Sequence, residues 1–238
     1  MNIGLFGGTF DPIHRGHLKV ARAAADRFKL REVWFIPVDI SPHKQKSPPT
    51  SYFHRYSMVA LAVADEPEFL ASLLEAPEPG AHMERQPSYT INTLRQVKAR
   101  LRRRDRVFFL VGIDAFRDIA KWHKSVELLR ECDFIVAARP GHSLENLAQW
   151  LPKELRPTSK EVQALGRDEA LHNYGVKLHL LPETHENVSA TQIRAAMRNG
   201  KALKKFVPDT VAEYIRKEGL YRTAVASRQL PVNRRRAS

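Results

Sequence analysis

The sequence has 238 residues, a length near the upper end for one α/β domain. Hydrophobic residues make up 43% and charged residues 27%, which excludes a mainly disordered chain and a fibrous repeat. No apolar run approaches the roughly 18 residues that a membrane span needs, and residues 1–4 show no secretory signal. The single cysteine, Cys132, excludes a disulfide framework and a cysteine-based zinc site, and it predicts a cytoplasmic location.

The charge is strongly basic and unevenly distributed. The formal net charge is +13, from 39 Lys and Arg against 26 Asp and Glu. Residues 222–238 contain five arginines and no acid, and residues 95–106 form a second basic cluster. A basic balance is compatible with nucleic acid, nucleotides or acidic lipid, but solvated charge explains both clusters better than a nucleic-acid surface does. We expect one domain over residues 1–222 and a basic, disordered tail over residues 223–238.

The first half of the chain alternates between strand and helix patterns. The apolar run Ile3–Phe6 predicts a buried strand, and apolar residues at helical spacing follow over 18–28. Val33–Ile36 predicts a second strand, which Pro37 ends. A loop rich in Pro and Ser covers 41–51, and a helix follows up to Val63.

The second half continues the alternation. Helices are predicted around 91–97 and 126–129, and strands at 107–111 and 134–137. Residues 139–175 have mixed polarity, and we expect an excursion from the core there, with short helices near 144–150 and 159–165. Residues 176–181 predict the last strand. Strands separated by helices imply parallel pairing, so the sequence predicts an α/β fold with a doubly wound parallel sheet.

One glycine- and histidine-rich string follows the first predicted strand. It runs Gly7-Gly8-Thr9-Phe10-Asp11-Pro12-Ile13-His14-Arg15-Gly16-His17. His14 and His17 are three residues apart, which places both rings on one face of a helical first turn. The helix N-terminus adds exposed N–H groups and partial positive charge, so the string is suited to a polyphosphate. Gly16 would let a ligand lie against the helix. The alternative for the histidine pair alone is a metal site or a surface accident, but no third ligand is obvious.

A second motif of the kind that binds phosphate lies near the end of the chain. Ser189 with Gln192 three residues later is a capping-box pattern, and Asn199-Gly200 ends the helix that it opens. Thr191 and Arg194 share one face of that helix. The alternative is that Ser189 only caps the helix and Arg194 is only solvated.

With these motifs the sequence resembles the bacterial nicotinate-nucleotide adenylyltransferases, a family within the nucleotidyltransferases that carry His-x-Gly-His. Matching segments occur in order over residues 3–221, weakly over 142–175 and not in the tail. Besides the string at residues 7–17, they are Pro42-His43-Lys44, Pro87-Ser88-Tyr89-Thr90, Gly112-Ile113-Asp114, Trp122, Arg139-Pro140-Gly141, Ser189-Ala190-Thr191-Gln192-Ile193-Arg194 and the final helical segment to Tyr221. The chain departs from the family at Ser41 and Asn92, where proline and an acid are more common.

The resemblance implies a Rossmann-like nucleotidyltransferase fold with a C-terminal helical segment. It also implies adenylyl transfer from ATP to nicotinate mononucleotide, which yields deamido-NAD and pyrophosphate. The groups that stabilise charge would be His14, His17, Lys44 and Arg194. Further contacts to ATP would come from Gly8, Thr9, Phe10, Gly16, Gly112, Asp114, Arg139, Ser189 and Thr191. Mg²⁺ would arrive on the phosphates of ATP without a direct protein ligand.

The resemblance places the pyridine end of the substrate at Tyr89, Thr90 and Trp122. Trp122 would stack on the ring, and the turn at Tyr89 and Thr90 would face the nicotinate carboxylate. Without the family, Trp122 could be a half-buried surface aromatic, Asp114 a helix cap, and Tyr89 and Thr90 the start of a helix.

Two other functions stay open from the sequence. One is an adenylyltransferase for nicotinamide mononucleotide or another small phosphate, such as phosphopantetheine. The other is a non-catalytic nucleotide- or RNA-binding protein, which the basic clusters would favour. We expect small-molecule substrates, no membrane and no nucleic acid as partners, and the sequence leaves homo-oligomer formation open.

Overall fold

A single mixed sheet organises the molecule. The computed structural model describes residues 1–40, 48–78, 87–138, 142–158, 160–161, 170–181 and 188–222. Seven strands pair in the order β3-β2-β1-β4-β5-β7-β6, and every neighbouring pair is parallel except β6 and β7. The strands are β1 (Asn2–Gly8), β2 (Glu32–Pro37), β3 (Phe69–Ala71), β4 (Arg106–Gly112), β5 (Asp133–Ala137), β6 (Ala170–Asn173) and β7 (Val176–Leu181). The predicted doubly wound parallel sheet is confirmed.

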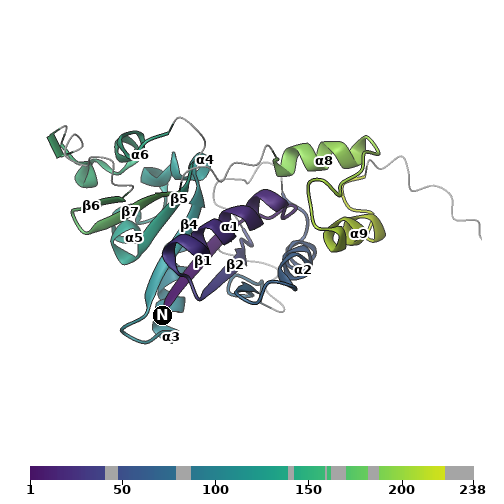
Figure 1. The fold of residues 1–238 in the computed structure, drawn as a ribbon, viewed down its shortest axis with the longest axis horizontal. Coiled ribbons are helices and arrows are strands. Elements are labelled where there is room, and N and C mark those ends of the chain that lie inside the picture. Colours follow the sequence, from purple (N-terminus) through teal and green to yellow (C-terminus); the bar gives the residue numbers. More distant parts are fainter. Residues whose placement is uncertain are drawn as a thin grey trace, which may run out of the picture.

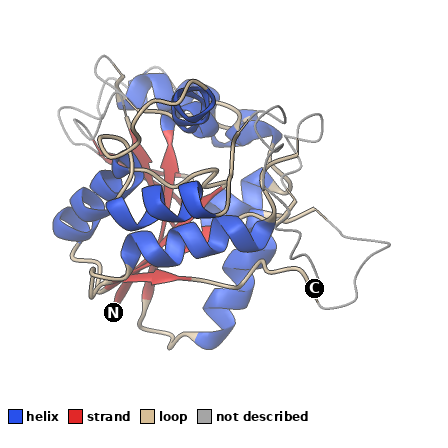
Figure 2. Ribbon diagram, turned by 90° about the vertical axis from the view of Figure 1, so that its right-hand side faces the viewer, coloured by secondary structure: helices blue, strands red, loops and turns tan. Residues whose placement is uncertain are grey.

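Helices cover both faces of this sheet (Figures 1 and 2). One apolar core lies under α3 (Thr90–Arg100), α4 (Ile113–Phe116), α5 (Ser125–Glu131) and α6 (Leu144–Trp150). The opposite core lies under α1 (Arg15–Phe28), α2 (Tyr52–Val63), α8 (Ala190–Arg198) and α9 (Asp209–Lys217). The central strands read as continuous apolar runs because their side chains enter both cores. Short 3₁₀ turns at Ile119–Lys121 and Lys153–Leu155 complete the described elements.

The predicted excursion over 139–175 is wrong at its end. Residues 170–173 form β6, which pairs antiparallel with β7 at the edge of the sheet. Tyr174 and Gly175 both have positive φ, 49° and 78°, as the two central residues of a tight hairpin turn require. The helix predicted at 144–150 is confirmed. The helix predicted at 159–165 falls mostly outside the described residues, as does the tail 223–238.

The short strand β3 was also missed by the sequence analysis. It has three residues, too few for a strand pattern, and it joins the sheet by pairing with Val33–Phe35 of β2. The predicted C-terminal helical segment is confirmed by α8 and α9, which lie together at one end of the molecule beside α2 (Figure 1). No helix within the described ranges is long and apolar enough to cross a membrane.

Candidate active site

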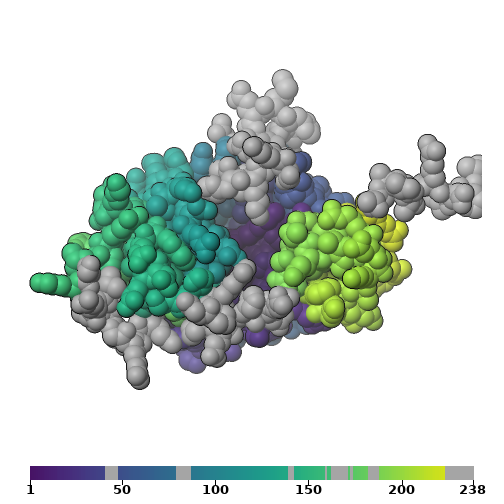
Figure 3. All heavy atoms as spheres, turned by 90° about the horizontal axis from the view of Figure 1, so that it is seen from above, coloured from purple at the N-terminus to yellow at the C-terminus, as the bar shows by residue number. Residues whose placement is uncertain are grey.

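The glycine- and histidine-rich string connects the end of β1 to the start of α1. β1 and β4 are neighbours at the centre of the sheet, and the chain winds away from them in opposite directions. The carboxyl ends of two such strands form the crevice in which doubly wound sheets bind ligands. Seen from above, the N-terminal segment is set back between the teal and green part of the chain and the yellow-green C-terminal segment (Figure 3).

The two histidines of the string form a stacked pair. Their ring centroids are 3.7 Å apart with an interplanar angle of 23°. The backbone N–H of His14, the N-cap of α1, donates to Nδ1 of His17 at 3.2 Å. A backbone N–H can only donate, so Nδ1 of His17 is the acceptor and the neutral ring carries its proton on Nε2. The fold therefore fixes one tautomer of His17, which leaves Nε2–H as a donor.

Burial keeps this pair neutral near pH 7. His14 is only 8% exposed, and burial lowers its pKa to about 4. Burial among the rings of Phe6, Phe10 and His14 lowers the pKa of His17 well below its usual value, and charge on His14 lowers it further. Nδ1 of His14 is buried and has no hydrogen-bond partner within the described residues. The pair thus offers hydrogen-bond donors and uncharged rings until an anion arrives.

Gly16 holds the pair close to a second segment of the chain. A Cβ at this position would lie 3.1 Å from Nδ1 of His14 and 3.1 Å from Cγ1 of Val188. The groups that lie against Gly16 are thus the His14 ring and Val188, which precedes α8. This close approach brings the start of α1 and the start of α8 together.

The ring of Phe10 packs against the histidine pair. Its φ is 48°, its side chain is 2% exposed, and its ring meets the His17 ring edge to face at 5.1 Å. A Cβ at Gly8 would lie 2.9 Å from the Phe10 ring, so the ring needs a glycine there. The side chain of Phe10 therefore belongs to the core.

The start of α8 carries the second predicted phosphate motif. Ser189 and Gln192 form the predicted capping box, since the Gln192 N–H donates to Oγ of Ser189 and the Ser189 N–H donates to the Gln192 side chain. Arg194 donates to the Asp11 carbonyl oxygen at 2.6 Å and to Oγ1 of Thr191 at 3.2 Å. The arginine thus connects α8 to the string that leads into α1.

A cavity of about 460 Å³ brings together most of the remaining predicted residues. It is bounded by the end of β1, the start of α3 and the segment after β4. Among its lining residues are Gly8, Thr9, Tyr89, Thr90, Asp114 and Trp122. The ring of Trp122 meets Phe109 edge to face at 6.3 Å, and Tyr89 stacks on His123 at 4.2 Å. Gly112 is exposed beside this cavity as the N-cap of α4, and a Cβ there would touch nothing within 4 Å.

Two of the predicted site residues, Lys44 and Arg139, fall outside the described residues. The loop 41–51 is described only from residue 48 onward. Within the described ranges, no cluster of three or more His, Cys, Asp and Glu side chains is arranged to hold a metal ion.

The sequence analysis missed a buried arginine that holds the loops around the site. Arg55 is 1% exposed, and its guanidinium donates to the carbonyl oxygens of Thr9, Val38 and Thr50 at 2.7–2.8 Å. Burial lowers its pKa. Thr9 lies in the loop after β1, whereas Val38 and Thr50 lie at the two ends of the connection between β2 and α2, so one cation fixes two loops at three points. The only signal in the sequence is a charged residue on the apolar face of α2.

Glu75 was missed as well, although it lines the cavity. Its Oε1 accepts a hydrogen bond from the Thr93 hydroxyl at 2.6 Å, and its buried Oε2 has no partner within the described residues. Burial raises the pKa of this carboxyl. Its neighbours are Thr93 of α3, Ser88 and the Asp39 backbone, so nothing in its local sequence marks it.

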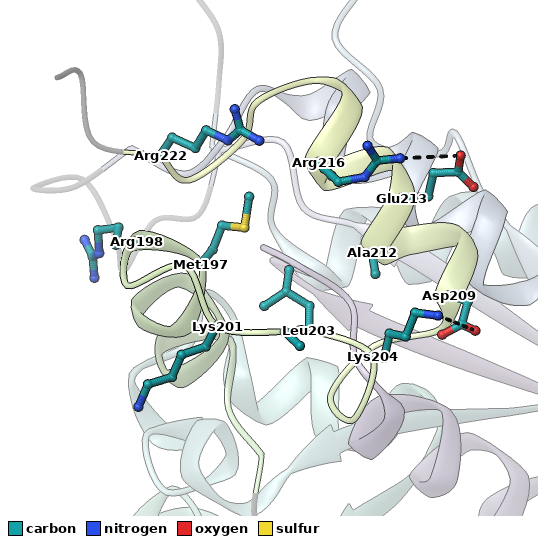
Figure 4. A pocket seen from close by; sticks show the side chains of 12 residues that line it. Met197, Arg198, Lys201, Leu203, Lys204, Asp209, Ala212, Glu213, Arg216 and Arg222 are labelled. Carbon is teal, nitrogen blue, oxygen red and sulfur yellow. Dashed lines mark ion pairs between the residues drawn. The ribbon is translucent and has the colours of Figure 1, made fainter. Parts of the chain in front are cut away.

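A hollow of about 880 Å³ lies apart from these residues, between the C-terminal end of α8 and α9 (Figure 4). Its lining is basic, but two of its cations pair with acids: Lys204 with Asp209 at 3.9 Å and Arg216 with Glu213 at 3.8 Å. The hollow contains none of the predicted site residues.

Comparisons with known proteins identify relatives of this chain. The family model described as "Cytidylyltransferase-like" matches residues 5–196. A protein of Moorella thermoacetica is 38% identical over 92% of this chain and 91% of its own length. A protein of Citrifermentans bemidjiense is 35% identical over 93% of this chain and 98% of its own length. A protein of Thermus thermophilus is 37% identical over 93% of this chain and all of its own. All three are named "Probable nicotinate-nucleotide adenylyltransferase".

The solved structures extend the similarity to the fold. The Plasmodium falciparum nicotinic acid mononucleotide adenylyltransferase in complex with NaAD has a TM-score of 0.64 at 19% identity, and the match covers 92% of this chain and 97% of that one. A putative enzyme of the same kind from Vibrio parahaemolyticus has a TM-score of 0.58 at 20% identity, over 92% and 94% of the two chains. From its sequence relatives and its fold together, the chain belongs to the nicotinate-nucleotide adenylyltransferase family, within the cytidylyltransferase-like proteins.

Proposed function

We propose that this chain transfers the adenylyl group of ATP to nicotinate mononucleotide. An oxygen of the mononucleotide's 5′-phosphate attacks the α-phosphorus of ATP. A new P–O bond forms, the bond between the α-phosphorus and the bridging oxygen breaks, and pyrophosphate leaves. The observation that carries this proposal is the meeting of two helix starts, each with its phosphate motif, next to one cavity at the ends of β1 and β4. This is a reaction of nucleotide biosynthesis, and we propose that it takes place in the cytoplasm.

The phosphate side of the reaction needs positioning and charge stabilisation only. The attacking phosphate is already anionic at pH 7, so no protein nucleophile is required. The Nε2–H of His17 is fixed as a donor and lies beside the N-terminus of α1, where it can stabilise charge on the transferring phosphoryl group. His14 and Arg194 would contact the other phosphate oxygens, and Ser189 and Thr191 sit at the start of α8, where N–H groups favour an anion.

The pyridine side is proposed to lie in the 460 Å³ cavity. Trp122 offers its ring as a stacking surface, and Tyr89 and Thr90 stand at the start of α3, where the partial positive charge of the helix favours an anion. The carboxylate of Asp114 can accept two hydrogen bonds from a ribose diol, and Gly112 leaves room for the ribose. The backbone of Gly8, Thr9 and Phe10 would connect the two halves of the site.

Lys44 and Arg139 are proposed to add positive charge to the phosphate side, in line with the resemblance of their motifs. Mg²⁺ is proposed to bind through ATP and water, where it would neutralise phosphate charge. Asp11 does not fit as a direct ligand, since its carboxylate already accepts from the Tyr221 hydroxyl and the Thr50 N–H.

The geometry weakens the nucleic-acid alternative. Within the basic cluster of residues 95–106, Arg95 pairs with Glu127 at 2.7 Å and Lys98 pairs with Glu131. Arg106 pairs with Asp133 at 2.8 Å. Acids of α5 and β5 thus pair with three of the seven basic side chains of the cluster, which reduces the positive charge that it could offer to phosphates.

The test is pyrophosphate release with ATP, Mg²⁺ and each of three acceptors: nicotinate mononucleotide, nicotinamide mononucleotide and phosphopantetheine. We expect release with the nicotinate substrate and a loss of roughly 10²–10⁴-fold in His17→Ala, the range for a group that stabilises transition-state charge. His54→Ala is the matched control, because His54 bonds Tyr214 between α2 and α9, away from the site. Release with none of the acceptors would refute the proposal.

A further inference from the structure

The segment after α8 closes one side of the phosphate site. The family-model match ends at residue 196, yet residues beyond it bond directly to the string that leads into α1. The Arg15 N–H donates to the Phe206 carbonyl oxygen at 2.9 Å, and the Arg15 guanidinium donates to the Lys204 carbonyl oxygen at 3.2–3.3 Å. Arg15 lies between His14 and Gly16, so this segment anchors the histidine turn.

Asp11 is the second point of attachment. It is 8% exposed, and its Oδ1 accepts a hydrogen bond from the Tyr221 hydroxyl at 2.7 Å. Its Oδ2 accepts from the Thr50 N–H at 3.3 Å and lies 4.0 Å from the Arg194 guanidinium. Arg194 also donates to the backbone carbonyl of Asp11. One buried carboxylate thus connects the string, α8 and the last turn of the described chain.

The Tyr221 hydroxyl acts as a fixed hydrogen-bond donor. Burial raises the pKa of Tyr221, and the neighbouring Asp11 charge raises it further, so the hydroxyl keeps its proton and donates. The hydroxyl also lies 3.9 Å from Sδ of Met58, a weak acceptor, and a hydrogen bond with the Thr50 side chain partly offsets the rise in its pKa. Asp11 is its charged partner.

We propose that Tyr221 is a positioning residue for the phosphate half of the site. Its hydroxyl fixes the Asp11 carboxylate, and Asp11 in turn fixes the Arg194 guanidinium and the turn that carries His14. Tyr221 touches no phosphate itself. The inference rests on the proposed function only in that Arg194 contacts ATP. It assigns a role in nucleotide binding to the end of the chain, outside the residues that the family model covers.

A second tyrosine of the same segment provides the matched control. The Tyr214 hydroxyl lies 2.8 Å from Nδ1 of His54 and joins α9 to α2, with no contact to Asp11. Tyr221→Phe and Tyr214→Phe each remove one hydrogen-bonded hydroxyl and keep the ring, so the folded state is retained in both. Thermal unfolding of the two variants checks this.

The experiment measures ATP affinity by calorimetry, without the second substrate, for wild type, Tyr221→Phe, Tyr214→Phe, Arg194→Ala and Tyr221→Phe/Arg194→Ala. We expect Tyr221→Phe to bind ATP about tenfold more weakly, the effect of losing one hydrogen bond to a charged group, and Tyr214→Phe to bind as wild type does. In the Arg194→Ala background, Tyr221→Phe should have a smaller effect than in wild type, because only the part that acts through the His14 turn remains.

Three outcomes would overturn the inference: equal affinity in wild type and Tyr221→Phe, equal losses in both tyrosine variants, or full additivity with Arg194→Ala. The readout also separates this inference from the proposed reaction. A protein that binds ATP with the expected pattern but releases no pyrophosphate would refute the reaction and support the positioning role. A wild-type protein that turns over normally, together with an unchanged ATP affinity in Tyr221→Phe, would support the reaction and refute the positioning role.

Discussion

The neutral histidine pair makes the stability of the folded protein depend on pH. In the unfolded chain His14 has a pKa near 6.5, and in the folded protein burial lowers it to about 4. The unfolded state therefore binds the proton more tightly. The contribution of neutral His14 to the free energy of unfolding is fully present above about pH 6.5 and is lost as the pH falls toward 4. His17 adds an effect of the same sign, since its pKa is also lowered.

The size of the effect follows from the shift. At about 1.4 kcal/mol per pKa unit, the folded state loses about 3 kcal/mol from His14 over the whole range and about 2 kcal/mol of that between pH 7 and 5. His14→Asn removes this titration and keeps a residue type that is favourable at an N-cap. Its free energy of unfolding should therefore fall by about 2 kcal/mol less than that of wild type over this interval.

Urea unfolding at pH 7 and pH 5 measures this difference. The control is Ile13→Val, which is fully buried next to the pair and should lower the free energy of unfolding by roughly 0.5–1.5 kcal/mol equally at both pH values. If His14→Asn loses as much stability as wild type on acidification, the His14 imidazole is not held neutral by burial. The reasoning about the donor state of the pair would then be wrong.

Three further predictions follow from the contacts around the site. Gly16→Ala should lower kcat at least tenfold with little loss of melting temperature, because its Cβ would push the His14 ring aside by a few tenths of an ångström; steady-state kinetics with unchanged thermal unfolding would show it. Arg55→Lys should lower the free energy of unfolding by about 3 kcal/mol, since an ammonium cannot reach three carbonyls in the geometry of a guanidinium, and chemical denaturation tests it. Glu75→Gln should raise the melting temperature at pH 8. The raised pKa of Glu75 means that its ionised form destabilises the fold as pH rises, and an unchanged melting temperature would contradict this.

The parts of the fold that the sequence predicted are those with a local cause. Ile3–Phe6 and Val107–Val111 are apolar on both faces because they are central parallel strands, and such runs are visible in any window of the sequence. The spacing of His14 and His17 predicted a shared face, and the rings are stacked. The capping box at Ser189 is likewise a pattern of four residues, and it forms as predicted.

The parts that were missed depend on contacts between distant residues. Arg55 acts on backbone carbonyls, which every residue has, so its sequence neighbours do not reveal its partners. Tyr221 meets Asp11 across nearly the whole chain. The edge strand β6 is defined by its pairing with β7, and its four residues have no periodicity of their own. Local patterns therefore predicted the candidate site residues, whereas the contacts that hold these residues in place needed the three-dimensional structure.

The pairing of β1 with β4 has a consequence for how the molecule assembles. The strand that carries Gly7 and Gly8 lies beside residues 106–112, so the two walls of the cavity are separated by about half of the chain. During synthesis the first β-α-β unit can form early, but its partner strand β4 leaves the ribosome only after about seventy further residues. Contacts of such high sequence separation are slow to form. The exposed flank of β1 then awaits β4, so the crevice at the ends of these two strands cannot form until the middle of the chain has been made.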